Sequence, residues 1–170
     1  FLYLLIIFWP KLKNISMARI DFHSQVNNKI LYCCRLIRKI MASPSTDFPM
    51  RNIVVVGSRD FLSELDQQLW SFSAVDFLPH AWAKDDFSNE TPIIFVESFD
   101  APELDALPHG DVLIHVGTGF PQSVDQLAGR FSRIVEIVST HEVDRQAGRD
   151  RYKAYRAAGH ELHNFDQTGQ

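Results

Sequence analysis

The chain is short of cysteine, has no excess of positive charge and lacks a long apolar run, and each shortage excludes a class of protein. Its only cysteines are adjacent, at Cys33 and Cys34. Adjacent residues close a disulfide only under strain, so we expect reduced thiols rather than a disulfide-stabilised secreted domain. The formal net charge of −4 argues against a protein whose whole surface binds nucleic-acid backbones.

The longest apolar run is the nine residues Phe1–Trp9. A membrane-spanning helix needs about 20 residues. A secretory signal has its positive charges before the apolar run, whereas the two lysines of this segment follow it. A strand pattern begins directly after Met17. We therefore predict that residues 1–16 are a non-native or disordered extension and that residues 17–170 form one domain, with a membrane anchor as the less favoured alternative.

Beyond the extension, segments with the pattern of strands alternate with segments that have the helical period of 3.6 residues. The predicted strands are residues 18–22, 53–56, 75–78, 93–96, 112–116 and 134–138. The predicted helices begin at Asn27 or Asn28, at Ser58, at Ser123 and, through a capping box with Glu142, at Ser139. Gly159 closes the last helix, and the polar tail from His160 is expected to be loosely held.

This alternation predicts an α/β protein, a three-layer α/β/α sandwich around a largely parallel sheet. The topology would be like that of nucleotide-binding proteins, yet no G-x-x-x-x-G-K-[ST] phosphate loop occurs. Gly57 and the pair Gly117 and Gly119 follow predicted strands without the further glycines of a dinucleotide-binding loop. A nucleotide-dependent enzyme with degenerate phosphate-binding loops therefore stays open as an alternative function.

Other catalytic and metal-binding patterns are weak. Among the seven histidines only His160 and His163 have ligand-like spacing, and they lie in the polar tail with no cysteine nearby. No G-x-S-x-G motif is present. Carboxylates such as Asp85 and Glu103 lie in predicted loops, where water solvates them, so they form no acid–base pair. We predict no catalytic residue, no metal and no cofactor.

The last predicted helix carries a stripe of one charge sign around a tyrosine. Within an arc of roughly 100° it presents Arg145, Arg149, Tyr152, Lys153 and Arg156. The opposite side, expected to dock on the sheet, carries the small residues Val143, Ala147, Ala154 and Ala158. Cations around an exposed aromatic ring suit a ligand that is both anionic and apolar. An ordinary solvated helix face is the alternative.

Three segments resemble one protein family. Gly148-Arg-Asp-Arg-Tyr-Lys-Ala-Tyr-Arg-Ala-Ala-Gly159 is similar to R-x-R-Y-K-x-Y-R-x-x-G, the signature of the chi subunit of bacterial DNA polymerase III. The segment Met17-Ala-Arg-Ile-Asp-Phe-His23 resembles the first strand of that family. Leu69-Trp70 with Asp76-Phe-Leu-Pro-His80 resembles its L-W…F-x-P-H segment. The likeness covers about residues 17–165.

The resemblance implies a non-catalytic accessory subunit of the clamp-loader assembly. Chi proteins join the psi subunit and bind the acidic C-terminal tail of single-stranded-DNA-binding protein, which ends in phenylalanine. DNA contact would then be mainly indirect, and the protein would be cytoplasmic, with no membrane contact.

For this chain, the resemblance implies that aspartates of the tail pair with Arg145, Arg149 and Lys153. The terminal phenylalanine would enter an apolar slot. The residues expected to line that slot are Tyr152, Val138, Trp70 and Phe77. Of these, Trp70 and Phe77 are equally suited to the core.

Overall fold

The computed structural model describes residues 18–43 and 51–170. The predicted extension, residues 1–16, lies outside the described residues. The elements in chain order are β1 (Arg19–Val26), α1 (Lys29–Ala42), β2 (Ile53–Val56), α2 (Arg59–Ser71), β3 (His80–Trp82), β4 (Ile93–Val96), α3 (Pro102–Ala106), β5 (Val112–His115), α4 (Val124–Arg130), β6 (Arg133–Ser139), α5 (Glu142–Ala157) and β7 (Leu162–Asp166).

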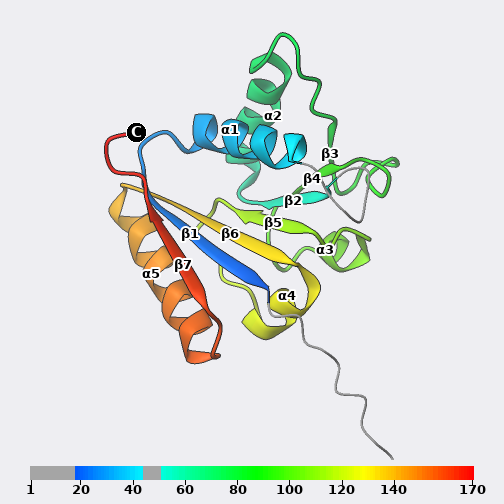
Figure 1. Cartoon of the computed structure of the whole chain (residues 1–170). Coiled ribbons are helices and arrows are strands. Elements are labelled where there is room, and N and C mark those ends of the chain that lie inside the picture. Colours follow the sequence, from blue (N-terminus) through cyan, green and yellow to red (C-terminus); the bar gives the residue numbers. More distant parts are fainter. Residues whose placement is uncertain (1–17, 44–50) are drawn as a thin grey trace, which may run out of the picture.

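The described strands form one seven-stranded parallel sheet in the order β3-β4-β2-β5-β6-β1-β7. Apolar side chains of α1 and α2 pack on one face of the sheet, and those of α3, α4 and α5 pack on the other (Figure 1). The predicted three-layer α/β/α sandwich is therefore confirmed. Within the described residues, no helix combines the length and the apolarity that crossing a bilayer requires.

Local sequence signals account for most of these elements. The strands β2, β4 and β5 are buried along their whole length, because helices cover both faces of the sheet. Asn28, Ser58 and Ser123 each accept a hydrogen bond from the backbone N–H three residues later and so begin α1, α2 and α4. Gly159 has a φ of 87° and follows the end of α5. These predicted helix boundaries are confirmed.

The prediction of a strand at residues 75–78 is wrong. The strand in this region is β3, which follows Pro79 instead of ending before it. The hydroxyl oxygen of Ser73 accepts hydrogen bonds from two backbone N–H groups of the predicted segment, at 3.4 and 3.2 Å. A turn held by this side chain therefore occupies donors that a strand ladder would use.

The expectation of a loosely held tail after His160 is also wrong, because residues of this tail form the edge strand β7. It pairs in parallel with β1, from Leu162 opposite Ile20 to Asp166 opposite Ser24. Strand pairing uses backbone groups that every residue carries, so the polar composition of the tail does not prevent it. An edge strand also tolerates polar side chains because it is only partly covered.

The chain order creates a crevice at the carboxyl ends of β6 and β1. These strands are neighbours, but the helix that follows β6 is α5 and the helix that follows β1 is α1, and these helices lie on opposite faces. In open parallel sheets, ligands bind outside the carboxyl ends of strands at such a reversal. The fold therefore indicates a ligand site near the start of α5.

Candidate partner-binding site

The start of α5 is held by an acidic side chain rather than by the predicted capping box. Ser139 ends β6, the helix begins at Glu142, and its N-cap residue His141 makes no side-chain cap. Oδ2 of Asp144 instead accepts hydrogen bonds from the backbone N–H of Ser139 at 2.7 Å and from Nζ of Lys29 at 2.8 Å. Burial opposes ionisation of Asp144, but these hydrogen bonds and the lysine charge outweigh it and lower the pKa of the carboxyl.

α5 packs on the sheet through a face other than the predicted one. Its buried residues are Asp144, Gly148, Arg151 and Tyr155. The residues predicted to dock are Val143, Ala147, Ala154 and Ala158, and none of them is buried. At Gly148 an added Cβ would lie 2.7 Å from Cγ2 of Val138. The absent side chain at this position is therefore what lets α5 approach β6 so closely.

Beneath α5 lies a fully buried charged cluster. Nε of Arg151 donates to Oε2 of Glu136 at 2.8 Å, and Nδ1 of His115 lies 2.8 Å from the same oxygen. Burial alone would raise the pKa of Glu136, but the neighbouring imidazole and guanidinium outweigh it, and the pKa lies below its ordinary value. Burial lowers the pKa of His115. We therefore assign an ionised Glu136 and a neutral His115 that donates its Nδ1–H.

The role of Arg151 was not predicted, because in the sequence it stands out only as one residue of the family-like segment from Gly148 to Gly159. A signal was available in β6, where Glu136 interrupts an apolar strand that is buried on both faces. A carboxylate in such a strand requires a buried cationic or hydrogen-bonding partner. Arg151 and His115 supply that partner and fix the rotation of α5 about its axis.

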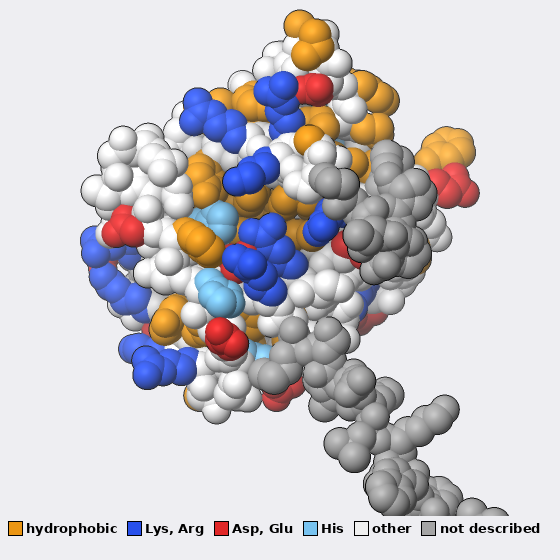
Figure 2. All heavy atoms as spheres, viewed as in Figure 1, with side chains coloured by type: hydrophobic (Ala, Val, Ile, Leu, Met, Phe, Trp, Pro, Cys, Tyr) orange, Lys and Arg blue, Asp and Glu red, His pale blue; other side chains and the backbone are white. Residues whose placement is uncertain are grey.

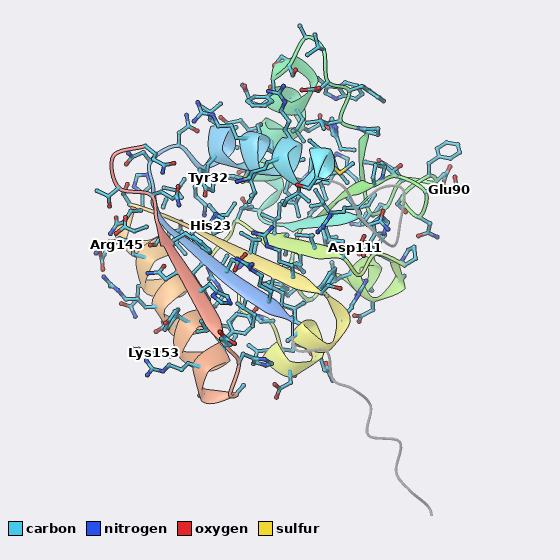
Figure 3. The ribbon with its side chains drawn as sticks, viewed as in Figure 1. His23, Tyr32, Glu90, Asp111, Arg145 and Lys153 are labelled. Carbon is cyan, nitrogen blue, oxygen red and sulfur yellow. The ribbon has the colours of Figure 1, made fainter. Side chains whose placement is uncertain are left out.

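With that rotation fixed, the predicted basic stripe lies on the outer side of α5. Figure 3 labels Arg145 near the start of the helix and Lys153 further along it. Nη1 of Arg145 donates to Oε2 of Glu142, and Nη1 of Arg149 donates to Oε1 of the same carboxylate, both at 3.1 Å. That carboxylate is 68% exposed. The two guanidinium groups therefore converge on a single anion at the surface.

A cavity of about 280 Å³ lies beside this stripe. Val138 and Tyr152 form its predicted apolar wall, and the three cations Arg145, Arg149 and Lys153 edge it. No acidic side chain belongs to the lining that the described residues provide. The phenol ring of Tyr152 is half-buried rather than exposed, because it packs edge to face on Phe22 of β1. This geometry offers an apolar slot with a positive rim.

The wall opposite α5 comes from β1 and β7 and was not predicted. Phe22 contacts the ring of Tyr152 with 5.1 Å between ring centroids. Ser24, Gln25 and Asn164 add polar groups to the lining. Between His23 and Val26 the strand β1 holds one residue more than β6 does, and Gln25 within this bulge has a φ of 61°. The bulge residues Ser24 and Gln25 line the cavity, at a point where a regular strand would continue its pairing with β6.

Comparison with known proteins assigns the family. The chain matches the family described as DNA polymerase III chi subunit, HolC, over residues 17–163. The chain belongs to this family. It is 31% identical over 152 residues to DNA polymerase III subunit chi of Pseudomonas aeruginosa, covering 86% of this chain and 94% of that protein. It is 32% identical over 98 residues to the Escherichia coli subunit of the same name, covering 58% and 61% of the two chains.

The resemblance found in the sequence is thereby confirmed, and this chi-family chain is an accessory subunit of replication. Three of its predicted site residues lie outside the cavity lining. Arg156 is exposed one helical turn beyond Tyr152. Trp70 and Phe77 lie at α2 and just after it, 60% and 70% exposed, with their ring centroids 5.9 Å apart. These two rings therefore belong neither to the slot nor to the core.

Close packing explains one of the two glycine turns of this chi-family chain. An added Cβ at Gly57 would lie 2.5 Å from Cγ2 of Val116, and one at Gly117 would lie 3.6 Å from the Cα of Gly57. The turns at Gly57 and Gly117 lie against each other, but only at Gly57 would an added Cβ clash, so packing accounts for that glycine without a bound phosphate. Among the described residues, no group of three or more His, Cys, Asp or Glu side chains is placed to hold a metal ion.

Proposed function

We propose that this chi-family chain is a non-catalytic adaptor of the clamp-loader assembly, in the cytoplasm at the replication fork. It holds the psi subunit on one surface and the acidic C-terminal tail of single-stranded-DNA-binding protein on another. The observation that carries the proposal is the cavity beside α5, in which an apolar slot and three cations meet with no acidic side chain in the described lining. An acidic peptide with a phenylalanine end is the ligand that this combination suits.

The tail would replace an anion that the protein already supplies. Glu142 accepts from Arg145 and Arg149, and this exposed pairing is worth less than about 1 kcal/mol. A tail carboxylate can therefore take its place at little cost. The terminal ring would then enter between Val138 and Tyr152, while aspartates upstream of it lie along Lys153 and the two arginines.

An adaptor also needs a second surface, and the exposed aromatic pair Trp70 and Phe77 is the one we assign to psi. His80 supports the pair from beneath, because its side chain is 1% exposed and its ring centroid lies 4.8 Å from that of Trp70. Clustered exposed aromatic side chains are typical of the centre of a protein–protein interface. This surface is apolar, whereas the cavity rim is cationic, so the two surfaces suit partners of different chemistry.

The tail site makes a direct prediction for binding. Arg149→Ala and Tyr152→Ala should each weaken binding of a tail peptide by about 1–3 kcal/mol, because one removes a charge-assisted hydrogen bond and the other an apolar wall. Isothermal titration calorimetry on the full chain measures this directly. Affinity should also fall with rising salt, because the rim cations are exposed.

Arg156→Ala is the matched control, since it removes the same charge from the same helix outside the cavity. It should change affinity much less than Arg149→Ala does. A peptide that lacks the terminal phenylalanine tests the slot by itself and should bind weakly to the wild type. Equal affinity for wild type, Arg149→Ala and Tyr152→Ala would remove the proposed tail site.

A further inference from the structure

On the sheet face that α1 and α2 share, the edge strand β7 and its neighbour β1 lie beyond α1. Residues Ile20 and Phe22 of β1 pack into the core on the α5 side. Arg19, Asp21 and His23, which alternate with them, therefore point to the other face, since side chains alternate along a strand. A groove of about 760 Å³ runs between α1 and this edge of the sheet. It shares no lining residue with the cavity beside α5.

The groove is positively charged. Figure 2 views this side of the molecule and shows Lys and Arg side chains gathered at its centre. Arg19 and Arg133 at the strand ends and Arg35 and Lys39 on α1 line the groove. Arg35 and Lys39 are exposed and have no ion-pair partner in the part of the chain that the structure describes. No acidic residue is among the described lining residues.

The acidic residue nearest these cations is neutralised and hidden. Asp21 is 0% exposed. Its carboxylate accepts hydrogen bonds from Nε of Arg19 at 2.9 Å and from Nε of Arg133 at 2.8 Å. The buried carboxylate therefore fixes the two arginines in the lining of the groove, and the solvent-facing side keeps a net positive charge.

Aromatic rings line the same groove. His23 stands between Tyr32 and Phe165, with ring centroids at 5.7 and 5.1 Å and edge-to-face geometry. The Tyr32 hydroxyl lies 2.5 Å from Nδ1 of His23, while Nε2 has no hydrogen-bond partner among the described residues. The ring of Phe165 is 38% exposed. Figure 3 labels His23 and Tyr32 on β1 and α1.

Cations around the partly exposed rings of Tyr32 and Phe165 suit single-stranded nucleic acid, in which phosphates pair with the cations and bases stack on the rings. β1 extends over about 26 Å at about 3.3 Å per residue. That length accommodates about four nucleotides, the lower end of known single-strand site sizes. We propose that the groove between α1 and the strands β1 and β7 binds single-stranded DNA directly.

The family supplies the choice of DNA, because its members are subunits of a DNA polymerase. An acidic protein segment would use the cations but would leave the rings of Tyr32 and Phe165 without a stacking partner. The site involves none of the residues assigned to the partner tail. A failure of the proposed adaptor role would therefore leave this DNA-binding proposal unaffected, and a failure of DNA binding would leave the adaptor role unaffected.

Fluorescence anisotropy with a labelled oligothymidylate of about twelve nucleotides tests the site on the full chain. The double variant Arg35→Ala/Lys39→Ala should bind about tenfold more weakly at low salt. Its slope of log affinity against log salt should become less steep by about 1.4, since each phosphate contact contributes about 0.7. Phe165→Ala should weaken binding about tenfold while leaving the salt slope unchanged, because stacking releases no counterions.

Two controls separate this site from others. Arg38→Ala removes a charge from the same helix outside the groove, where Arg38 pairs with Asp76, and should bind DNA like the wild type. Arg149→Ala should lose the tail peptide and keep DNA. No binding by the wild type at low salt, or wild-type binding by Arg35→Ala/Lys39→Ala, would overturn the proposal. Equal competition by a polyglutamate of the same charge would overturn it in favour of an acidic protein partner.

Discussion

At the scale of single residues, buried charge decides how the site is built. Arg151 lies two residues from Arg149 and one residue from Tyr152, yet its side chain is 0% exposed and pairs with Glu136. Nε of Arg151 and Nδ1 of His115 meet one oxygen of that carboxylate. A buried ion pair of this kind fixes geometry more than it adds stability, because desolvation offsets much of the attraction. The cluster therefore sets which α5 residues face the cavity.

Removing one member of this cluster should be costly. Glu136→Gln leaves the charge of Arg151 buried without a countercharge and should lower the free energy of unfolding by about 3–5 kcal/mol at neutral pH. The folded-state pKa of Glu136 lies below its ordinary value of 4.5. Its contribution is therefore complete above about pH 4.5 and is lost as the pH falls through the folded-state pKa. Chemical denaturation at neutral and acid pH should show the variant's deficit shrinking in acid.

Two comparisons make this result specific to the pair. Glu90→Gln removes an exposed carboxylate and should change stability by no more than about 0.5 kcal/mol. The double variant Glu136→Gln/Arg151→Met replaces both charges and should recover much of the loss. A double variant as unstable as Glu136→Gln would show that the charge of Arg151 is not the cause.

At the scale of elements, α5 is positioned by the absence of a side chain. Gly148 faces Val138, and its Cβ would lie 2.7 and 3.0 Å from the two methyl groups of that valine. Val138 cannot turn away easily, because a β-branched side chain has few rotamers. The same valine lines the cavity, so helix packing and slot width depend on one contact.

Gly148→Ala should therefore destabilise the protein, although alanine is the better helix former. The clash should cost about 1–3 kcal/mol, which exceeds the gain of about 1 kcal/mol from helix propensity. An added Cβ at Gly129 in α4 would meet no neighbouring atom within 4 Å, so Gly129→Ala should be neutral or stabilising. Thermal denaturation compares the two, and Val138→Ala should rescue Gly148→Ala. Equal melting temperatures for both glycine variants would contradict the packing argument.

At the scale of the whole molecule, three surfaces are separate. Figure 1 shows α2, which carries Trp70 and is followed by the segment that holds Phe77, far from α5 and on the opposite face of the sheet. The basic groove lies along β1 between α1 and β7. An adaptor can hold two partners at once only if its sites do not overlap, and this arrangement allows that.

The separation predicts that the two protein-binding activities can be removed one at a time. Trp70→Ala/Phe77→Ala should lose psi in co-purification and keep full affinity for the tail peptide, with unchanged stability because both rings are exposed. Arg149→Ala should lose affinity for the tail peptide and keep psi. Phe87→Ala, which removes a different ring that is 72% exposed, is the control and should keep both partners. Loss of tail binding in the Trp70→Ala/Phe77→Ala variant would show that the surfaces are coupled.

The elements were predictable where local signals are strong. Buried β-branched runs such as Ile53–Val56 and caps such as Ser58 are read within one short segment. The edge strand β7 was not predictable, because its pairing with β1 joins residues about 140 positions apart and relies on backbone groups alone. The strand expected at residues 75–78 failed because a serine side chain competed for its backbone donors.

The sequence by itself determined the class of fold, the family and the cationic stripe with its tyrosine, because each depends on residue order and helical spacing. The tertiary structure decided which residues share a surface. It buried Arg151, moved Trp70 and Phe77 away from the slot and brought Phe22 and Asn164 to it. The physical reason is that a cavity wall is made by strands distant in the chain, and their register follows from packing and buried charge rather than from local pattern.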